Sequence, residues 1–189
     1  MKRTLDGATA TSPILTIDKM TVTYDPQEDR LRLAVKDSSE RHAALWLTQR
    51  LANRLVGAIA DWLSTLSEPA SAAKPSSSAT RHWDKATQLA WQQSSAQAEY
   101  QPSVPVQADP DAPVGLIDSI DISGQRHLLK LLFKTPQPRA VLYLSPQQAH
   151  QWLGILRTRF EQAEWSLQGW PLWVIGATFT DASQRPVLH

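Results

Sequence analysis

Residues 44–48 read Ala-Leu-Trp-Leu-Thr, and residues 141–145 read Val-Leu-Tyr-Leu-Ser. In both segments a short apolar stretch ends at a hydroxyl side chain, Thr48 or Ser145, a residue type preferred at the N-cap of a helix. A helical period of apolar residues follows each cap. Because the pattern, the cap and the following period agree, the sequence predicts that one strand-to-helix unit occurs twice in the chain.

Each copy is expected to hold three strands before its helix. The signals are enrichment in Ile, Val and Thr and the alternation of apolar with polar residues. The predicted strands cover 14–24, 30–36 and 42–47 in the first copy, and 115–123, 127–134 and 140–144 in the second. Turn-forming residues separate these segments, so each copy is expected to form a meander.

The expected fold follows from how these copies would bury their apolar faces. One helix covers a three-stranded meander poorly, so the two copies are expected to pack together. The predicted fold class is α+β, with two tandem βββα repeats forming a roughly six-stranded, mostly antiparallel sheet with two packed helices, related by a pseudo-two-fold axis. Residues 1–66 hold the first repeat, and residues 114–189 hold the second repeat and a Trp-rich tail.

Repeats of several strands followed by one helix are similar, in topology, to the single-stranded nucleic-acid-binding repeats of Whirly and PUR proteins. Those repeats usually have four strands where three are counted here. The resemblance concerns the order of elements alone, and no binding residue is carried over from it.

The tail after the second helix is rich in tryptophan. Trp165, Trp170 and Trp173 are expected in the core rather than at an interface. Gly169 argues against a continued helix, and residues 172–175 are expected to form a further strand that closes the sheet.

Residues 67–113 form a linker rich in Pro, Ser and Ala, a composition that buries too little apolar surface to order itself. Its middle differs, because residues 80–99 combine Trp83, Leu89 and Trp91 with helix-tolerant Ala and Gln. The sequence predicts a short Trp-bearing helix there. Two interpretations stay open: the helix packs back on the parent domain, or it is a motif that binds a partner.

Composition narrows the classes of protein. The net charge is +1, so there is no global attraction to nucleic acid or to an anionic membrane. The chain has no cysteine, which excludes disulfides, thiolate metal sites and thiol catalysis. A secretory signal and a transmembrane segment are not expected, because no long apolar run is present. A cytoplasmic location is the expectation.

Motifs for catalysis are not found. The five histidines lack the spacing of helical metal ligands, and no Walker loop, Rossmann glycine motif or nucleophile elbow occurs. No metal and no cofactor are therefore predicted, and the chain is not expected to be an enzyme. The best acid–base candidates are Asp18 and Asp118, which occupy equivalent strand positions and are expected on the apolar face, most simply as structural groups.

Basic and aromatic side chains recur on the polar face of the predicted sheet. The cations are Arg32, Lys36, Lys130 and Lys134, and the aromatic residues at equivalent third-strand positions are Trp46 and Tyr143. A sheet face that combines cations with aromatic rings can hold single-stranded nucleic acid. A solvated face that keeps the sheet soluble is the simpler interpretation.

The leading functional hypothesis is a non-enzymatic interaction or assembly module that binds a protein partner or self-associates. It depends on the duplication, the tryptophan surplus, the linker helix and an uncovered sheet edge. The alternative hypothesis is binding of single-stranded DNA or RNA through the basic and aromatic face. The two differ in salt dependence, because contacts to phosphates weaken steeply as salt is added.

Overall fold

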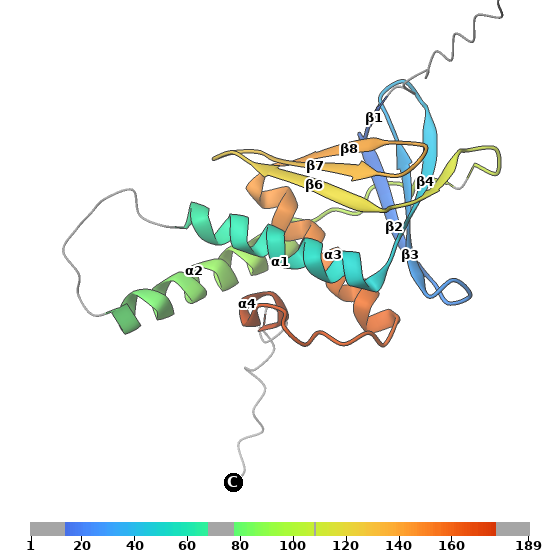
Figure 1. The fold of residues 1–189 in the computed structure, drawn as a ribbon. Helices are drawn as coiled ribbons and strands as arrows, with labels where there is room; N and C mark the ends of the chain where they lie inside the picture. The colour runs from blue at the N-terminus through green and yellow to red at the C-terminus, as the bar shows by residue number, and fades with distance from the viewer. Residues whose placement is uncertain (1–13, 68–77, 108, 177–189) are drawn as a thin grey trace, which may run out of the picture.

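A computed structural model describes residues 14–67, 78–107 and 109–176, with the backbone alone for residues 78–84 (Figure 1). The described chain is α+β, with eight strands in two mixed sheets of four and with four helices. In Figure 1 the strands of the two sheets run crosswise. The helices of residues 49–66 and 146–162 lie in the angle between the sheets.

The first sheet has the order β2-β3-β4-β5, and the second has the order β1-β8-β7-β6. In each sheet three consecutive strands form an antiparallel meander, and a short fourth strand pairs parallel with the last of them. The first meander comprises β2 (Lys19–Asp25), β3 (Arg30–Lys36) and β4 (His42–Leu47), joined by β5 (Val114–Leu116). The second comprises β6 (Ser119–Gly124), β7 (Leu129–Lys134) and β8 (Ala140–Leu144), joined by β1 (Leu15–Thr16).

The fourth strand of each sheet comes from the other half of the chain. Leu15 pairs with Ala140, and Gly115 pairs with Leu45. The predicted single six-stranded sheet is therefore wrong, and the βββα repeat is not matched exactly, because a short strand precedes each meander. Each predicted first strand divides in two: the residues before the break join the other half's sheet, and those after it join their own meander.

The two breaks fall at Asp18 and Asp118. The backbone N–H of Asp18 donates to the carbonyl of Lys36, and that of Asp118 donates to the carbonyl of Lys134. Both aspartates are exposed, so the expectation that they point to the apolar face is wrong. The apolar side chains before them, Ile17 and Ile117, are buried in their place.

Two helices follow the meanders at the predicted caps. Helix α1 (Gln49–Leu66) begins after Thr48, whose hydroxyl accepts from the N–H of Leu51. Helix α3 (Pro146–Gln162) begins after Ser145, which forms a full capping box with Gln148. Helix α2 (Ser78–Ala98) lies between the halves in sequence. Helix α4 (Leu172–Ile175) is the last element of the described residues, so the strand expected at 172–175 is wrong.

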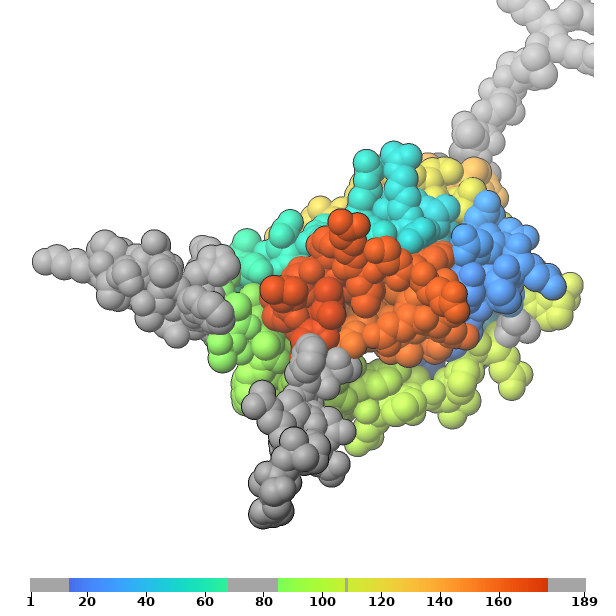
Figure 2. Space-filling model, turned by 90° about the horizontal axis from the view of Figure 1, so that it is seen from below, coloured from blue at the N-terminus to red at the C-terminus, as the bar shows by residue number. Residues whose placement is uncertain are grey.

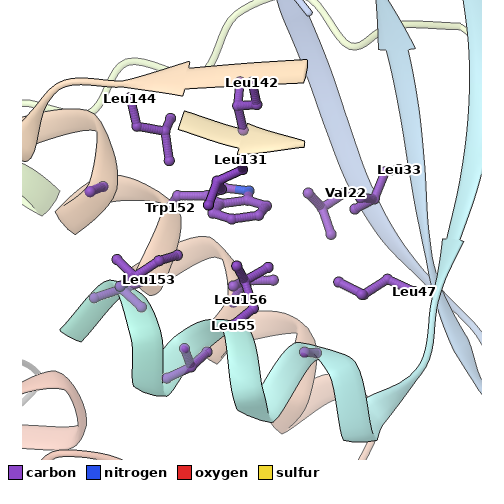
Figure 3. Packing of buried hydrophobic residues seen from close by; sticks show 14 of the residues in the cluster. Val22, Leu33, Leu47, Leu55, Leu131, Leu142, Leu144, Trp152, Leu153 and Leu156 are labelled. Atoms are coloured by element: carbon purple, nitrogen blue, oxygen red, sulfur yellow. The ribbon is translucent and has the colours of Figure 1, made fainter. Parts of the chain in front are cut away.

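The core lies between the two sheets and the helices α1 and α3. Figure 3 shows Val22, Leu33 and Leu47 of the first sheet pointing toward Leu131 of the second, with Trp152 of α3 between them. This follows the alternation of the strands, since every second residue of β3 is fully buried. The sequence pattern therefore located the core, although it assigned all the strands to one sheet.

The segment after α3 folds back over the helices. Phe160 packs edge-to-face against both Trp165 and Trp170. The indole of Trp165 donates to Asp29 in the β2–β3 turn, and the indole of Trp170 donates to Asn53 of α1. In Figure 2 this orange segment lies against both the blue first hairpin and the cyan α1. Both indole rings are buried, as expected, whereas Trp173 is partly buried.

Candidate functional site

The outer faces of the two sheets carry the six predicted binding residues, and four of the six are directly opposed in cross-strand pairs. Arg32 of β3 lies directly opposite Trp46 of β4, with its guanidinium carbon 6.0 Å from the ring centroid. In the other sheet, Lys130 of β7 lies directly opposite Tyr143 of β8. The structure thus places a cation opposite an aromatic residue twice, but on separate sheets rather than on the single face that was expected.

The remaining two predicted cations have acidic partners. Lys36 forms an ion pair with Glu40, and Lys134 forms one with Asp121 at 2.6 Å. A cation that faces a carboxylate must exchange that partner before it can neutralise a phosphate. The positive charges of two of the four predicted cations are therefore already neutralised by neighbouring carboxylates.

The outer face of the first sheet is partly covered by the chain itself. The backbone N–H of Val106, in the segment that follows α2, donates to the hydroxyl of Thr21 on this face at 2.8 Å. Two polar atoms of the same face, Nε of Arg32 and Nδ1 of His42, are buried without a hydrogen-bond partner. The polar groups on this sheet are thus not freely presented to solvent.

A second candidate site is a groove of about 480 Å³ next to α2. Four segments meet there: the end of α1, the second half of α2, the β6–β7 turn and the start of α3. The lining includes apolar Leu63, Leu66, Ala96 and Pro146, with Trp91, Glu99, Arg126, His127, Gln147 and His150 among the larger side chains around them. This volume lies in the range of pockets that hold small ligands or side chains of a partner.

The β6–β7 turn is held at the groove by Trp62 of α1. The indole N–H of Trp62 donates to the carbonyl of Gln125 at 3.0 Å. Gly124 lies so close to the same ring that a Cβ at this position would collide with it. Glycine is thus required for the close approach of turn and helix. This contact places Arg126 and His127 at the groove.

Helix α2 is fixed to α3 by side-chain amides. The amide nitrogens of Gln93 and Gln97 each donate to the carbonyl of His150 at 3.0 Å. The Gln93 oxygen lies 2.8 Å from Nδ1 of His150, so Nδ1 carries the proton and donates. Leu89 is also buried. These contacts determine which face of α2 turns toward solvent.

Burial controls the charge of His150. Desolvation lowers the pKa of this imidazole from 6.5 to about 4. The ring packs edge-to-face against Trp173. His150 is therefore neutral at physiological pH and lines the groove as an uncharged side chain.

The charged groups around the groove differ in their partners. Glu99 accepts a hydrogen bond from the amide of Gln147 at 2.6 Å. Arg126 is exposed, and within the described part of the chain it forms no ion pair. As far as the described side chains go, the groove thus offers the unpaired guanidinium of Arg126 beside an apolar lining.

The predicted partner motif in α2 divides among three environments. Trp91 is 69% exposed and lines the groove, whereas Leu89 is 2% exposed and belongs to the core. Trp83 lies in α2, but its side chain is outside the described residues. Sequence reasoning did not identify Arg126, His127 or Gln147 as groove residues. The signal for the turn, Ser-Gly-Gln at 123–125, was present, but nothing in it indicated a neighbouring helix.

The described ranges contain no candidate metal site and no candidate membrane-spanning helix. No group of three His, Asp or Glu side chains could hold a metal ion there, and no described helix has the length and hydrophobicity to cross a bilayer. Comparison of the chain with family models, with curated proteins and with solved structures gives no match.

Proposed function

We propose that this protein is a non-enzymatic interaction module that binds a segment of a protein partner in the groove beside Trp91. The observation that carries the proposal is the 69% exposure of Trp91 at the edge of a groove of about 480 Å³. A tryptophan left in water forgoes a large burial energy, and tryptophan dominates the binding energy of many interfaces. Elsewhere in α2, Leu89 is buried and Gln93 and Gln97 are hydrogen-bonded to His150, whereas Trp91 is exposed for a partner to cover.

The partner segment is defined by the chemistry of the lining. Leu63, Leu66 and Pro146 favour an apolar or aromatic side chain of the partner. Arg126 lacks a carboxylate partner among the described side chains, so an Asp, a Glu or a terminal carboxylate next to that apolar residue would complete the site. A peptide with an apolar anchor beside an acidic group therefore fits best.

Selection from a random peptide library displayed on phage tests this proposal. Enriched peptides are expected to combine an apolar anchor with an acidic residue within a few positions. Trp91→Ala and Arg126→Glu should each weaken the binding of such a peptide by about tenfold or more. The matched control is Leu172→Ala, which removes an apolar side chain that is 84% exposed outside the groove. Absence of enrichment, or peptides that bind all three variants equally, would refute the proposal.

A second candidate function is binding of single-stranded nucleic acid. What favours it is the pairing of Arg32 with Trp46 and of Lys130 with Tyr143 in direct cross-strand register. Such pairs combine a charge for phosphate with a ring for base stacking. The extra short strand also brings each half to four strands, the number usual in Whirly and PUR repeats.

Tryptophan fluorescence measured during titration with short single-stranded DNA and RNA distinguishes this candidate. If it is correct, quenching at low salt weakens steeply with added salt. Lys130→Ala and Trp46→Ala would then reduce binding, whereas Trp91→Ala would not. A flat response at both salt concentrations would leave the groove as the sole candidate.

A further inference from the structure

Strand β6 (Ser119–Gly124) forms one edge of the second sheet, with β7 on its inner side. In the described ranges no strand pairs with its outer side. Unpaired backbone groups along a sheet edge are a template for a further strand.

The register shows which backbone groups of β6 are free. At the end of the ladder, Gln125 and Leu128 exchange both N–H to carbonyl bonds, so they form a hydrogen-bonded pair. Such pairs alternate along an antiparallel ladder. Ser119, Asp121 and Ser123 therefore direct their backbone groups to β7, whereas Ile120, Ile122 and Gly124 direct theirs outward.

The edge lacks two residue types that often protect such strands. No proline or lysine occurs in β6, and Ile122 is 37% exposed. Its one charged residue, Asp121, is paired with Lys134 of the neighbouring strand. The carboxylate is thus compensated within the sheet and does not repel an approaching strand.

We propose that two copies of this chain associate by antiparallel pairing of β6 with β6 about a two-fold axis at Ile122. This register uses all three outward-directed residues, because Ile122 meets its own copy and Ile120 meets Gly124. It places Asp121 opposite Ser123 and brings the two exposed Ile122 side chains together. Moving the two-fold axis from Ile122 to Asp121, a slip of two residues between the strands, would place the two Asp121 carboxylates opposite each other, which is unfavourable.

The partner strand is β6 of a second copy because the edge of β6 is complementary to itself in this register. The same short strand supplies both donors and acceptors, both apolar side chains and a register without like-charge pairs. Closed two-fold dimers are also the commonest oligomers of soluble proteins. The result would be one continuous sheet formed from the second sheets of the two copies.

Sedimentation equilibrium of the full chain, from low micromolar to submillimolar concentration, tests this dimer. The wild-type mass is expected to rise from one chain to two. Ile122→Pro removes an N–H that points away from β7, so it should block the edge while leaving the ladder intact. Ile122→Lys should act similarly by placing two cations at the axis. Both variants are expected to remain single chains, with a urea midpoint like that of the monomeric wild type.

The matched control is Leu172→Lys, which introduces the same charge at an apolar residue that is 84% exposed elsewhere. It is expected to dimerise like the wild type. A wild type that stays a single chain throughout would overturn the inference. So would dimers of the two Ile122 variants as tight as those of the wild type, or a control that loses dimerisation as they do.

Discussion

Acidification from pH 7 to pH 5 is expected to weaken the fold through the imidazole of His150. Burial lowers the pKa of this group from 6.5 to about 4. The unfolded chain therefore binds a proton as the pH falls below 6.5, whereas the folded chain keeps the ring neutral. The contribution of His150 to the free energy of unfolding is therefore complete above pH 6.5. It declines as the pH falls toward 4 and levels off below that pH.

The expected loss follows from the two pKa values. Between pH 7 and pH 5 the linkage relation gives a decrease of about 2 kcal/mol in the free energy of unfolding from this group alone. The full separation of the two pKa values corresponds to about 3 kcal/mol, reached near pH 4. Between pH 7 and pH 5 the effect is measurable before most carboxylates titrate.

Urea unfolding followed by circular dichroism at several pH values measures this loss. The reference variant is His150→Gln, which keeps an amide group near Gln93 but does not titrate. We expect the stability difference between wild type and variant to shift by about 2 kcal/mol, in the variant's favour, from pH 7 to pH 5. Parallel stability curves for the two proteins would show that desolvation of His150 does not control this pH dependence.

Three further substitutions test local packing by urea unfolding. Gly124→Ala is expected to destabilise the fold by about 1–3 kcal/mol, because the added methyl group collides with the ring of Trp62. Gly57→Ala is expected to have the opposite effect, a gain in stability of about 1 kcal/mol, because alanine is favoured over glycine in a helix interior. Gly57 lies within α1, and no atom lies near the added methyl group, so a loss of stability would contradict this environment. Ser145→Ala removes the hydroxyl that accepts from Gln148 and should cost about 1 kcal/mol, whereas an unchanged midpoint would mean that the cap is not needed.

Much of the fold could be predicted because its signals are local. The alternation in residues 30–36 places Leu31, Leu33 and Val35 inside, and all three are buried. The caps at Thr48 and Ser145 also depend only on residues within one turn of a helix. Such features are encoded by neighbours in the sequence.

The exchange of short strands could not be predicted. Strands β1 and β5 have two and three residues, too few to show a period of two. Their partners lie in the other half of the chain, and only the backbone break at Asp18 or Asp118 separates them from the next strand. Sequence periodicity therefore merged each with its neighbour and led to one sheet where there are two.

The groove was inaccessible to sequence reasoning for a related reason. It requires α2 to dock on α3, which depends on amides of Gln93 and Gln97 bonded to one backbone carbonyl. No apolar period signals such bonds. The sequence singled out Trp91 as part of a partner motif, but its exposure and its neighbour Arg126 appear only in three dimensions.

The groove beside Trp91 is proposed to accept an apolar group joined to an anion. The most direct measurement is a proton–nitrogen NMR spectrum of the indole groups of the full chain, in which the Trp91 signal is assigned with Trp91→Phe. The protein is titrated with 3-phenylpropionate, a small probe with an aromatic ring and a carboxylate, and separately with phenethylamine, its cationic counterpart. We expect the Trp91 indole signal to shift with 3-phenylpropionate and much less with phenethylamine, while the signals of the buried indoles of Trp165 and Trp170 stay in place. A Trp91 signal that does not move, or that responds equally to both probes, would contradict it.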